Sequence, residues 1–111
     1  MSEIGIATTP DPDSILKALH REARASQAFL NACDAATRAE ERVEDAYAAK
    51  DRAEGLGAAA EAERQIDHAC DTYANALTGR WIREHALRRS EELSNDMLQR
   101  WRDLRQSCRA E

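Results

Sequence analysis

Residues 13–54 read DSILKALHREARASQAFLNACDAATRAEERVEDAYAAKDRAE, and this stretch decides the fold because it contains neither glycine nor proline. Its commonest residues are Ala, Glu and Arg, all of which favour helix. Pro12 precedes it among Asp and Ser residues that suit a helix start, and Gly55 follows it as a stop. The stretch therefore predicts one long helix over residues 13–54 and a turn over residues 55–57.

The helical pattern resumes at residue 58. A first apolar seam, with spacings of four, three and four, consists of Ile66, Cys70, Tyr73 and Leu77. A second seam of different phase follows Gly79 and consists of Ile82, Ala86, Ser90, Leu93, Met97, Trp101, Leu104 and Cys108. The phase change predicts either two helices, over residues 58–78 and 80–109, or one continuous helix that absorbs the change as a stutter.

These elements predict an all-α protein. We expect a long antiparallel helical hairpin, a coiled-coil-like bundle of two helices, or of three if the chain breaks at Gly79. With the turn centred on Leu56, residue i faces residue 112 minus i, so that Leu19 meets Leu93. The core stripe expected on the first helix is Ile15, Leu16, Leu19, Ala23, Phe29, Leu30 and Cys33. Residues 13–111 then form a single helical domain, preceded by an irregular arm over residues 1–12 that contains Ile4 and Ile6.

The amino-acid composition limits the classes of protein to which this chain can belong. The chain of 111 residues has 33% charged residues but a net charge of only -5, which is typical of solvated helix faces. No apolar run approaches a membrane span, and residues 1–12 do not resemble a signal peptide. Cys33, Cys70 and Cys108 are too widely spaced for a metal motif. We expect them to be small core residues of a cytoplasmic protein.

Charge is unevenly distributed along the chain. Residues 34–71 contain eleven acidic and five basic residues, whereas residues 79–111 contain six acidic and eight basic ones. The hairpin therefore has an acidic tip, which either docks on a basic surface, mimics nucleic-acid phosphates or is simply solvated. Its candidate residues are Glu40, Glu41, Glu44, Asp45, Asp51 and Glu54.

The last helix combines an arginine-rich face with apolar residues outside its seam. Trp and Arg are the residue types that dominate interaction hot spots, so this helix is the candidate partner-binding surface. The same arginines also suit nucleic-acid phosphates, or form ion pairs with Glu84 and Glu91. The candidate residues are Trp81, Arg80, Arg83, Leu87, Arg88, Leu98, Arg102 and Arg105.

The sequence contains no motif for catalysis, cofactor binding or zinc. Glu40 and Glu44 are expected opposite His68 and Asp71, as in carboxylate metal sites of helical bundles, but the Glu-x-x-His motif of those sites is absent. We therefore expect a non-catalytic helical protein–protein interaction module: an adaptor, chaperone-like binder, regulator or inhibitor. Its partner is another protein or a second copy of the chain, since five aromatic residues make a thin core. The alternative is a nucleic-acid-associated regulator. Arginine outnumbers lysine 14 to 2, as in small accessory proteins of GC-rich bacteria and their mobile elements.

Overall fold

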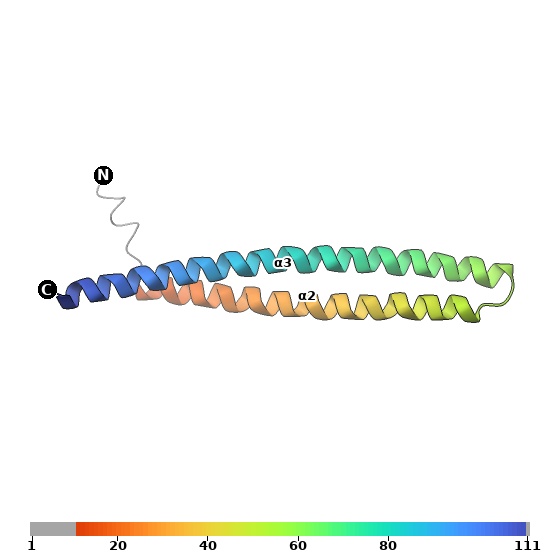
Figure 1. The fold of residues 1–111 in the computed structure, drawn as a ribbon, viewed down its shortest axis with the longest axis horizontal. Helices are drawn as coiled ribbons and strands as arrows, with labels where there is room; N and C mark the ends of the chain where they lie inside the picture. The colour runs from red at the N-terminus through yellow and green to blue at the C-terminus, as the bar shows by residue number, and fades with distance from the viewer. Residues whose placement is uncertain (1–10, 111) are drawn as a thin grey trace, which may run out of the picture. The chain divides into compact units, whose positions relative to one another are not determined.

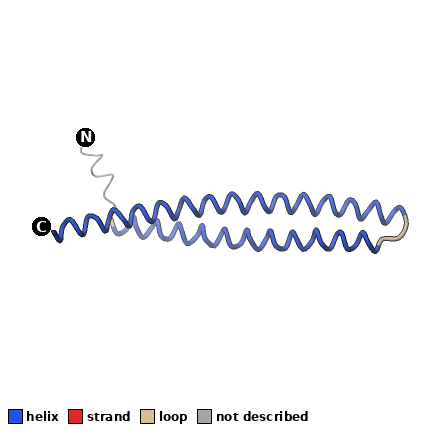
Figure 2. Tube along the Cα trace, viewed as in Figure 1, coloured by secondary structure: helices blue, strands red, loops and turns tan. Residues whose placement is uncertain are grey.

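The computed structural model describes residues 11–110, with side chains up to Arg109. Two helices, α2 (Pro12–Arg52) and α3 (Leu56–Ala110), account for almost all of them and are joined by a turn over residues 53–55 (Figures 1 and 2). The predicted all-α helical hairpin is confirmed. The predicted arm with Ile4 and Ile6 lies largely outside the described residues.

The start of α2 is capped by Asp11. The Ser14 backbone N–H donates a hydrogen bond of 2.7 Å to the Asp11 carboxylate, and the Ile15 N–H donates one of 3.1 Å to the Asp11 carbonyl oxygen. Pro12 occupies the first helical position, where its missing N–H costs nothing. The hydrogen bond from the Ser14 N–H is the main reason why the pKa of the Asp11 carboxyl lies below its ordinary value of 3.8.

This cap predicts a pH-dependent contribution to stability. A carboxyl whose pKa is depressed in the folded state stabilises the fold above its unfolded-state pKa, and the stabilisation is lost as pH falls through the folded-state pKa. We expect Asp11→Ala to lower the melting temperature at about pH 7 and to have little effect at about pH 2. Asp11→Asn, which keeps an acceptor oxygen, is the control and should be milder at about pH 7. Thermal melts followed by circular dichroism test this, and an equal loss from Asp11→Ala at both pH values would contradict it.

The turn lies two residues earlier than expected, at residues 53–55, because Gly55 both ends α2 and starts α3. Gly55 has a φ of +88°, a conformation that side chains with a Cβ rarely adopt. Its carbonyl oxygen accepts a 3.0 Å hydrogen bond from the Ala59 N–H, which is the first bond of α3. Leu56 and Gly57 therefore belong to the first turn of α3 rather than to the loop.

α3 passes through Gly79 without a break, so the hairpin has two long helices rather than three. The Thr78 hydroxyl donates a 3.0 Å hydrogen bond to the Ala74 carbonyl oxygen of its own helix. Gly79 keeps a negative φ, and a Cβ added to it would meet no atom within 4 Å. The phase change at this point is absorbed within a continuous helix.

Replacing either of two glycines with alanine should change the stability of the protein, but in opposite directions. Gly55→Ala should destabilise the protein by about 1 kcal/mol, because alanine is strained at positive φ even without a clash. Gly79→Ala should stabilise it by about 1 kcal/mol, because alanine has the higher helix propensity and the position has room. Urea denaturation at one fixed protein concentration measures both changes. Destabilisation by Gly79→Ala would show that α3 bends at this glycine.

The chain divides into two compact units, and each contains a segment of both helices. The terminal unit comprises Met1–Gln27 and His85–Glu111, and the turn unit comprises Ala28–Glu84. Within each unit, α2 and α3 lie side by side and run in opposite directions (Figure 1). The buried residues of the terminal unit are Ile15, Ala18 and Ser94, and those of the turn unit are Ala36, Ala39, Ala62, Ile66 and Ala69.

The predicted register is confirmed in the terminal unit. The buried Ser94 hydroxyl donates a 3.3 Å hydrogen bond to the Ala18 carbonyl oxygen, and these two residue numbers add to 112. In the turn unit, the Lys50 ammonium group lies 3.0 Å from the Glu63 carboxylate, which agrees with the same register within one residue. Each unit therefore has one contact between α2 and α3 that reports its alignment.

The predicted apolar seams are only partly right. The predicted seam residues that are buried or half-buried, as expected, are Ile15, Phe29, Cys33, Ile66, Tyr73, Leu77, Ser90, Met97 and Trp101. Leu19 and Leu93 occur at matching levels but are both exposed, as are Leu16, Leu30 and Ile82, and so are Ala23, Cys70, Ala86, Leu104 and Cys108. Instead, α2 places inward a repeat with alternating spacings of three and four, in which six of the ten residues are alanine. The residues of this repeat, all buried or half-buried, are Ile15, Ala18, Glu22, Ala25, Phe29, Ala32, Ala36, Ala39, Val43 and Ala46. A 3-4 repeat of this kind is the pattern of a coiled-coil seam.

The inward face of α3 follows the same rule. It presents Ala62, Ile66, Ala69 and Tyr73 in the turn unit, and Leu87, Ser90, Ser94, Met97 and Trp101 in the terminal unit. The physical reason is size. Small side chains at a helix contact let two backbones approach closely and make many contacts, whereas rows of leucine would hold them apart. Alanine and serine therefore supply most of the fully buried positions, and the larger inward residues are, apart from two isoleucines, half-buried. Leu16, Leu19 and Leu93 lie on the flanks.

Candidate functional site

Exposed leucines flank the core of the terminal unit. Leu16 directly follows the buried Ile15, and Leu19 directly follows the buried Ala18, so each lies about 100° around α2 from a core position. On α3, Leu93 directly precedes the buried Ser94. Leu16 is 50% exposed, which leaves half of a large apolar side chain in water. The terminal unit thus has apolar flanks that its own two helices do not cover.

The turn unit has exposed apolar residues of its own. Leu30 follows the half-buried Phe29, and Trp81 and Ile82 are consecutive on α3. Trp81 is 60% exposed and Ile82 is 50% exposed. Tyr47 and Leu56 are also exposed. In the described residues, only Ile15 and Ile66 are buried apolar side chains larger than alanine, whereas nine large apolar side chains are exposed.

The predicted partner-binding residues are divided between the units. Arg80, Trp81 and Arg83 are exposed in the turn unit, and Arg88, Arg102 and Arg105 are exposed in the terminal unit. Leu87 and Leu98 are half-buried, so their side chains contribute partly to the contact between α2 and α3. The exposed leucines of α2 were not among the predicted site residues, because their size had placed them in the expected core.

Three arginines gather near the end of α3. Arg102, Arg105 and Arg109 line a hollow of about 150 Å³ together with Gln106. The Arg105 guanidinium carbon lies 4.8 Å from the centre of the Trp101 ring, a cation–π contact that covers one face of the indole. The Trp101 side chain also lines an apolar hollow of about 190 Å³ with Pro12, Ile15 and Leu98.

The predicted acidic tip is exposed and lies entirely within the turn unit. Glu40, Glu41, Glu44 and Asp45 form no ion pair within 4.0 Å among the described residues. Asp51, near the end of α2, and Glu54, in the turn, are both exposed. The turn unit has twelve acidic and seven basic residues, a net charge of -5, whereas the sequence of the terminal unit has nine acidic and nine basic residues, a net charge of 0.

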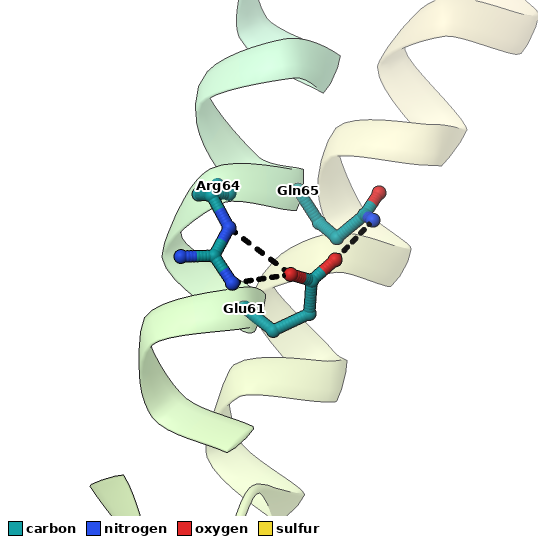
Figure 3. A network of polar contacts seen from close by, with 3 residues as sticks. All are labelled: Glu61, Arg64 and Gln65. Carbon is teal, nitrogen blue, oxygen red and sulfur yellow. Dashed lines mark hydrogen bonds and ion pairs between the residues drawn. The ribbon is translucent and has the colours of Figure 1, made fainter. Parts of the chain in front are cut away.

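Two other acidic residues of the turn unit are already compensated. The Glu61 carboxylate accepts hydrogen bonds from the Gln65 amide at 2.9 Å and from the Arg64 guanidinium at 3.0 and 2.6 Å (Figure 3). These bonds, with that from Gln65 foremost, lower the pKa of Glu61. The Glu63 carboxylate accepts a hydrogen bond from Lys50, which raises the pKa of that ammonium group. Glu61 and Glu63 therefore differ from the acidic residues around residues 40–45 of α2, which form no such ion pair.

The carboxylates and histidine expected to face one another do not form a metal site. Among the described residues, no three His, Cys, Asp or Glu side chains lie close enough together to hold a metal ion. Asp45 and His68 line a hollow of about 360 Å³, but its other residues are mainly alanine, Arg42 and Gln65. The prediction that all three cysteines are core residues is wrong, because Cys33 is half-buried whereas Cys70 and Cys108 are exposed free thiols.

Neither α2 nor α3 contains an apolar stretch long enough to cross a membrane. Comparison with known proteins finds no matching family model, no matching curated protein and no matching solved structure.

Proposed function

We propose that this chain is a non-catalytic helical protein–protein interaction module. The observation that supports the proposal most directly is the number of large apolar side chains that the hairpin leaves exposed. Five of the seven buried apolar residues are alanines, whereas leucines of α2, and Trp81 and Ile82 of α3, are exposed. A helix that is apolar on a second face normally contacts a second neighbour. The flanks of the hairpin are therefore the working surface of an adaptor, a regulator or an inhibitor.

The cellular setting follows from the cysteines. Cys33, Cys70 and Cys108 are free thiols. The reducing cytosol keeps thiols in this state, and we propose that the protein works there.

A capture experiment tests the proposal. The full chain is used as bait in a lysate of the cells that make it, and both captured proteins and self-association are measured. We expect association with a defined protein, or with a second copy, that is lost when Leu16→Gln and Leu19→Gln are combined. Ala86→Gln is the matched control, because Ala86 is exposed in the same unit but has no large apolar side chain. A chain that binds no protein and does not self-associate would refute the proposal.

A second candidate function is nucleic-acid binding, which is supported by the grouping of Arg102, Arg105 and Arg109 around one hollow. Neutralising phosphates with these arginines would give an affinity that falls steeply with salt. Fluorescence anisotropy with labelled single- and double-stranded oligonucleotides tests it. Absence of binding at low salt, or binding unaffected by Arg102→Ala and Arg109→Ala, would exclude this candidate.

A further inference from the structure

We propose that the end of the terminal unit binds single-stranded nucleic acid, with an unpaired base in the apolar hollow beside Trp101 and the adjoining phosphates on the arginines of α3. This inference goes beyond protein–protein interaction. It rests on the nucleic-acid candidate, which it deepens by naming the form of nucleic acid and the place of one base. Three observations support it: two adjoining hollows of different chemistry, the grouping of the arginines and the engagement of the nearest acidic side chains.

Two hollows of different chemistry adjoin each other in the terminal unit. The first, of about 190 Å³, is apolar, and it is lined by Pro12, Ile15, Leu98 and Trp101. The second, of about 150 Å³, is polar, and it is lined by Arg102, Arg105, Gln106 and Arg109. They are joined by the contact between Trp101 and Arg105, whose guanidinium carbon lies 4.8 Å from the centre of the indole ring. An aromatic surface beside arginines is the combination with which proteins hold the bases and the phosphates of single strands.

The three arginines share one exposed face of α3. Arg102, Arg105 and Arg109 follow one another at spacings of three and four, so they lie within about 60° of one another around the helix and span about 10 Å along its axis. α3 continues past the start of α2 at this end (Figure 1), so the other helix of the unit does not cover this face. About two or three successive phosphates of one strand can therefore contact it at once.

The acidic side chains near these arginines are already engaged. Of the described acidic residues, Asp96 and Asp103 are the nearest to them along α3. The Asp96 carboxylate lies 3.0 Å from the Arg100 guanidinium group, and the Asp103 carboxylate accepts a 2.9 Å hydrogen bond from the Gln99 amide. Both acidic residues lie about 100° or more around α3 from each of the three arginines. The arginine face therefore keeps its positive charge over the described residues 98–110, although the terminal unit as a whole has a net charge of 0.

The apolar hollow favours single strands over duplexes. In a duplex each base is stacked on its neighbours and paired across the helix, so its faces are not available to a side chain such as the Trp101 indole. In a single strand every base has a free π-face that can stack on an aromatic ring, whatever the base is. We therefore expect a preference for single strands and little dependence on base sequence.

Fluorescence anisotropy of the full chain with a fluorescein-labelled oligothymidylate of about 16 nucleotides tests the inference. We expect the single strand to bind about tenfold more tightly than its duplex with oligoadenylate. With two or three phosphate contacts, the affinity should fall about 25- to 130-fold between about 50 and 500 mM NaCl. In a Trp81→Phe chain, where Trp101 is the one remaining tryptophan, binding should also quench the tryptophan fluorescence.

Two double variants with the same change in net charge test the arginine face. Combining Arg102→Ala and Arg109→Ala should weaken binding at about 50 mM NaCl by roughly tenfold or more and make its salt dependence shallower. Combining Arg89→Ala and Arg100→Ala is the matched control, because these two arginines are exposed on the opposite side of α3 in the same unit. The control should change the dissociation constant by less than about threefold.

Substitutions of Trp101 test the base hollow. Trp101→Leu keeps an apolar side chain but removes the aromatic ring, and it should raise the dissociation constant about fivefold or more. Trp101→Phe restores an aromatic ring and should recover most of the affinity. Circular dichroism confirms that both variants keep their helices. If Trp101→Leu does not fold, the quenching of Trp101 in the Trp81→Phe chain decides the question, because it needs no change at the hollow.

The outcomes separate this inference from the proposed functions. Equal affinity for single strand and duplex, or a Trp101 fluorescence that binding leaves unchanged, would overturn the single-strand site. Equal losses from the two double variants would overturn it as well. Absence of binding at about 50 mM NaCl would overturn both this inference and the nucleic-acid candidate. The protein–protein interaction function is tested separately, by the capture experiment with the Leu16 and Leu19 variant.

Discussion

Replacing Ala36 with leucine should destabilise the protein by about 1–3 kcal/mol and lower its melting temperature by roughly 4–12 °C. Ala36 is 2% exposed, and the register places it opposite the half-buried Ala76 of α3. A leucine has no space at this contact without moving the two helices apart, and separation would weaken the neighbouring contacts of Ala39 and Ala69 as well.

The matched control is Ala74→Leu, at an exposed position of α3 in the same unit. Leucine and alanine both favour helix, so this change should alter the free energy of unfolding by no more than about 0.5 kcal/mol. Ala36→Val should fall between the wild type and Ala36→Leu if size is the cause. Thermal and urea denaturation measure all three variants. Equal effects of leucine at both positions would show that α2 and α3 do not meet at Ala36.

Much of the fold was predictable because it depends on where helix breakers occur. The absence of glycine and proline from residues 13–54 predicts the long α2, and the glycines that follow it predict the turn. The register predicted from a turn centred on Leu56 also agrees with the bond between Ser94 and Ala18, although the turn itself lies at residues 53–55. Helix length and turn position depend mainly on local sequence, and the structure differs from both predictions by only about two residues.

The rotation of the helices was not predictable by following the largest apolar residues. Leu16, Leu19 and Leu30 trace a plausible stripe, yet the structure buries the alanines beside them. The information was present in the 3-4 spacing from Ile15 to Ala46, but alanine is so common in this chain that its periodicity is easily overlooked. The close approach of the two backbones decides which face of each helix is buried, and this approach depends on both helices together.

The same rotation determines how much of the candidate site could be anticipated. The acidic tip is a continuous stretch of sequence, so its place in the turn unit follows from the hairpin alone. The arginines are spread over the whole second half of α3, and whether they meet depends on three-dimensional placement. Arg102 and Arg105 line one hollow, whereas Arg80 and Arg83 belong to the other unit. The exposed leucines became candidates only once the alanine core was known.

Two isoleucines of α3 can be compared to test which residues form the core. Ile66 is 7% exposed and Ile82 is 50% exposed, and both belong to the turn unit. Ile66→Ala should cost about 2–4 kcal/mol, because it removes buried methyl groups and leaves a cavity beside Ala62 and Ala69. Ile82→Ala, the same chemical change at an exposed position, should cost less than about 1 kcal/mol in the isolated chain.

Protein concentration makes this comparison informative about assembly as well. The cost of Ile66→Ala arises inside one chain, so much of it should remain when the protein is diluted. If Ile82 is covered by a second copy, the cost of Ile82→Ala should grow as concentration rises, because mass action then couples folding to association. Urea denaturation at protein concentrations of about 1 and 100 µM measures the loss of stability caused by each substitution. Equal costs for the two isoleucines at the lower concentration would mean that Ile82 is buried within a single chain, and the alanine seam would then be the wrong core.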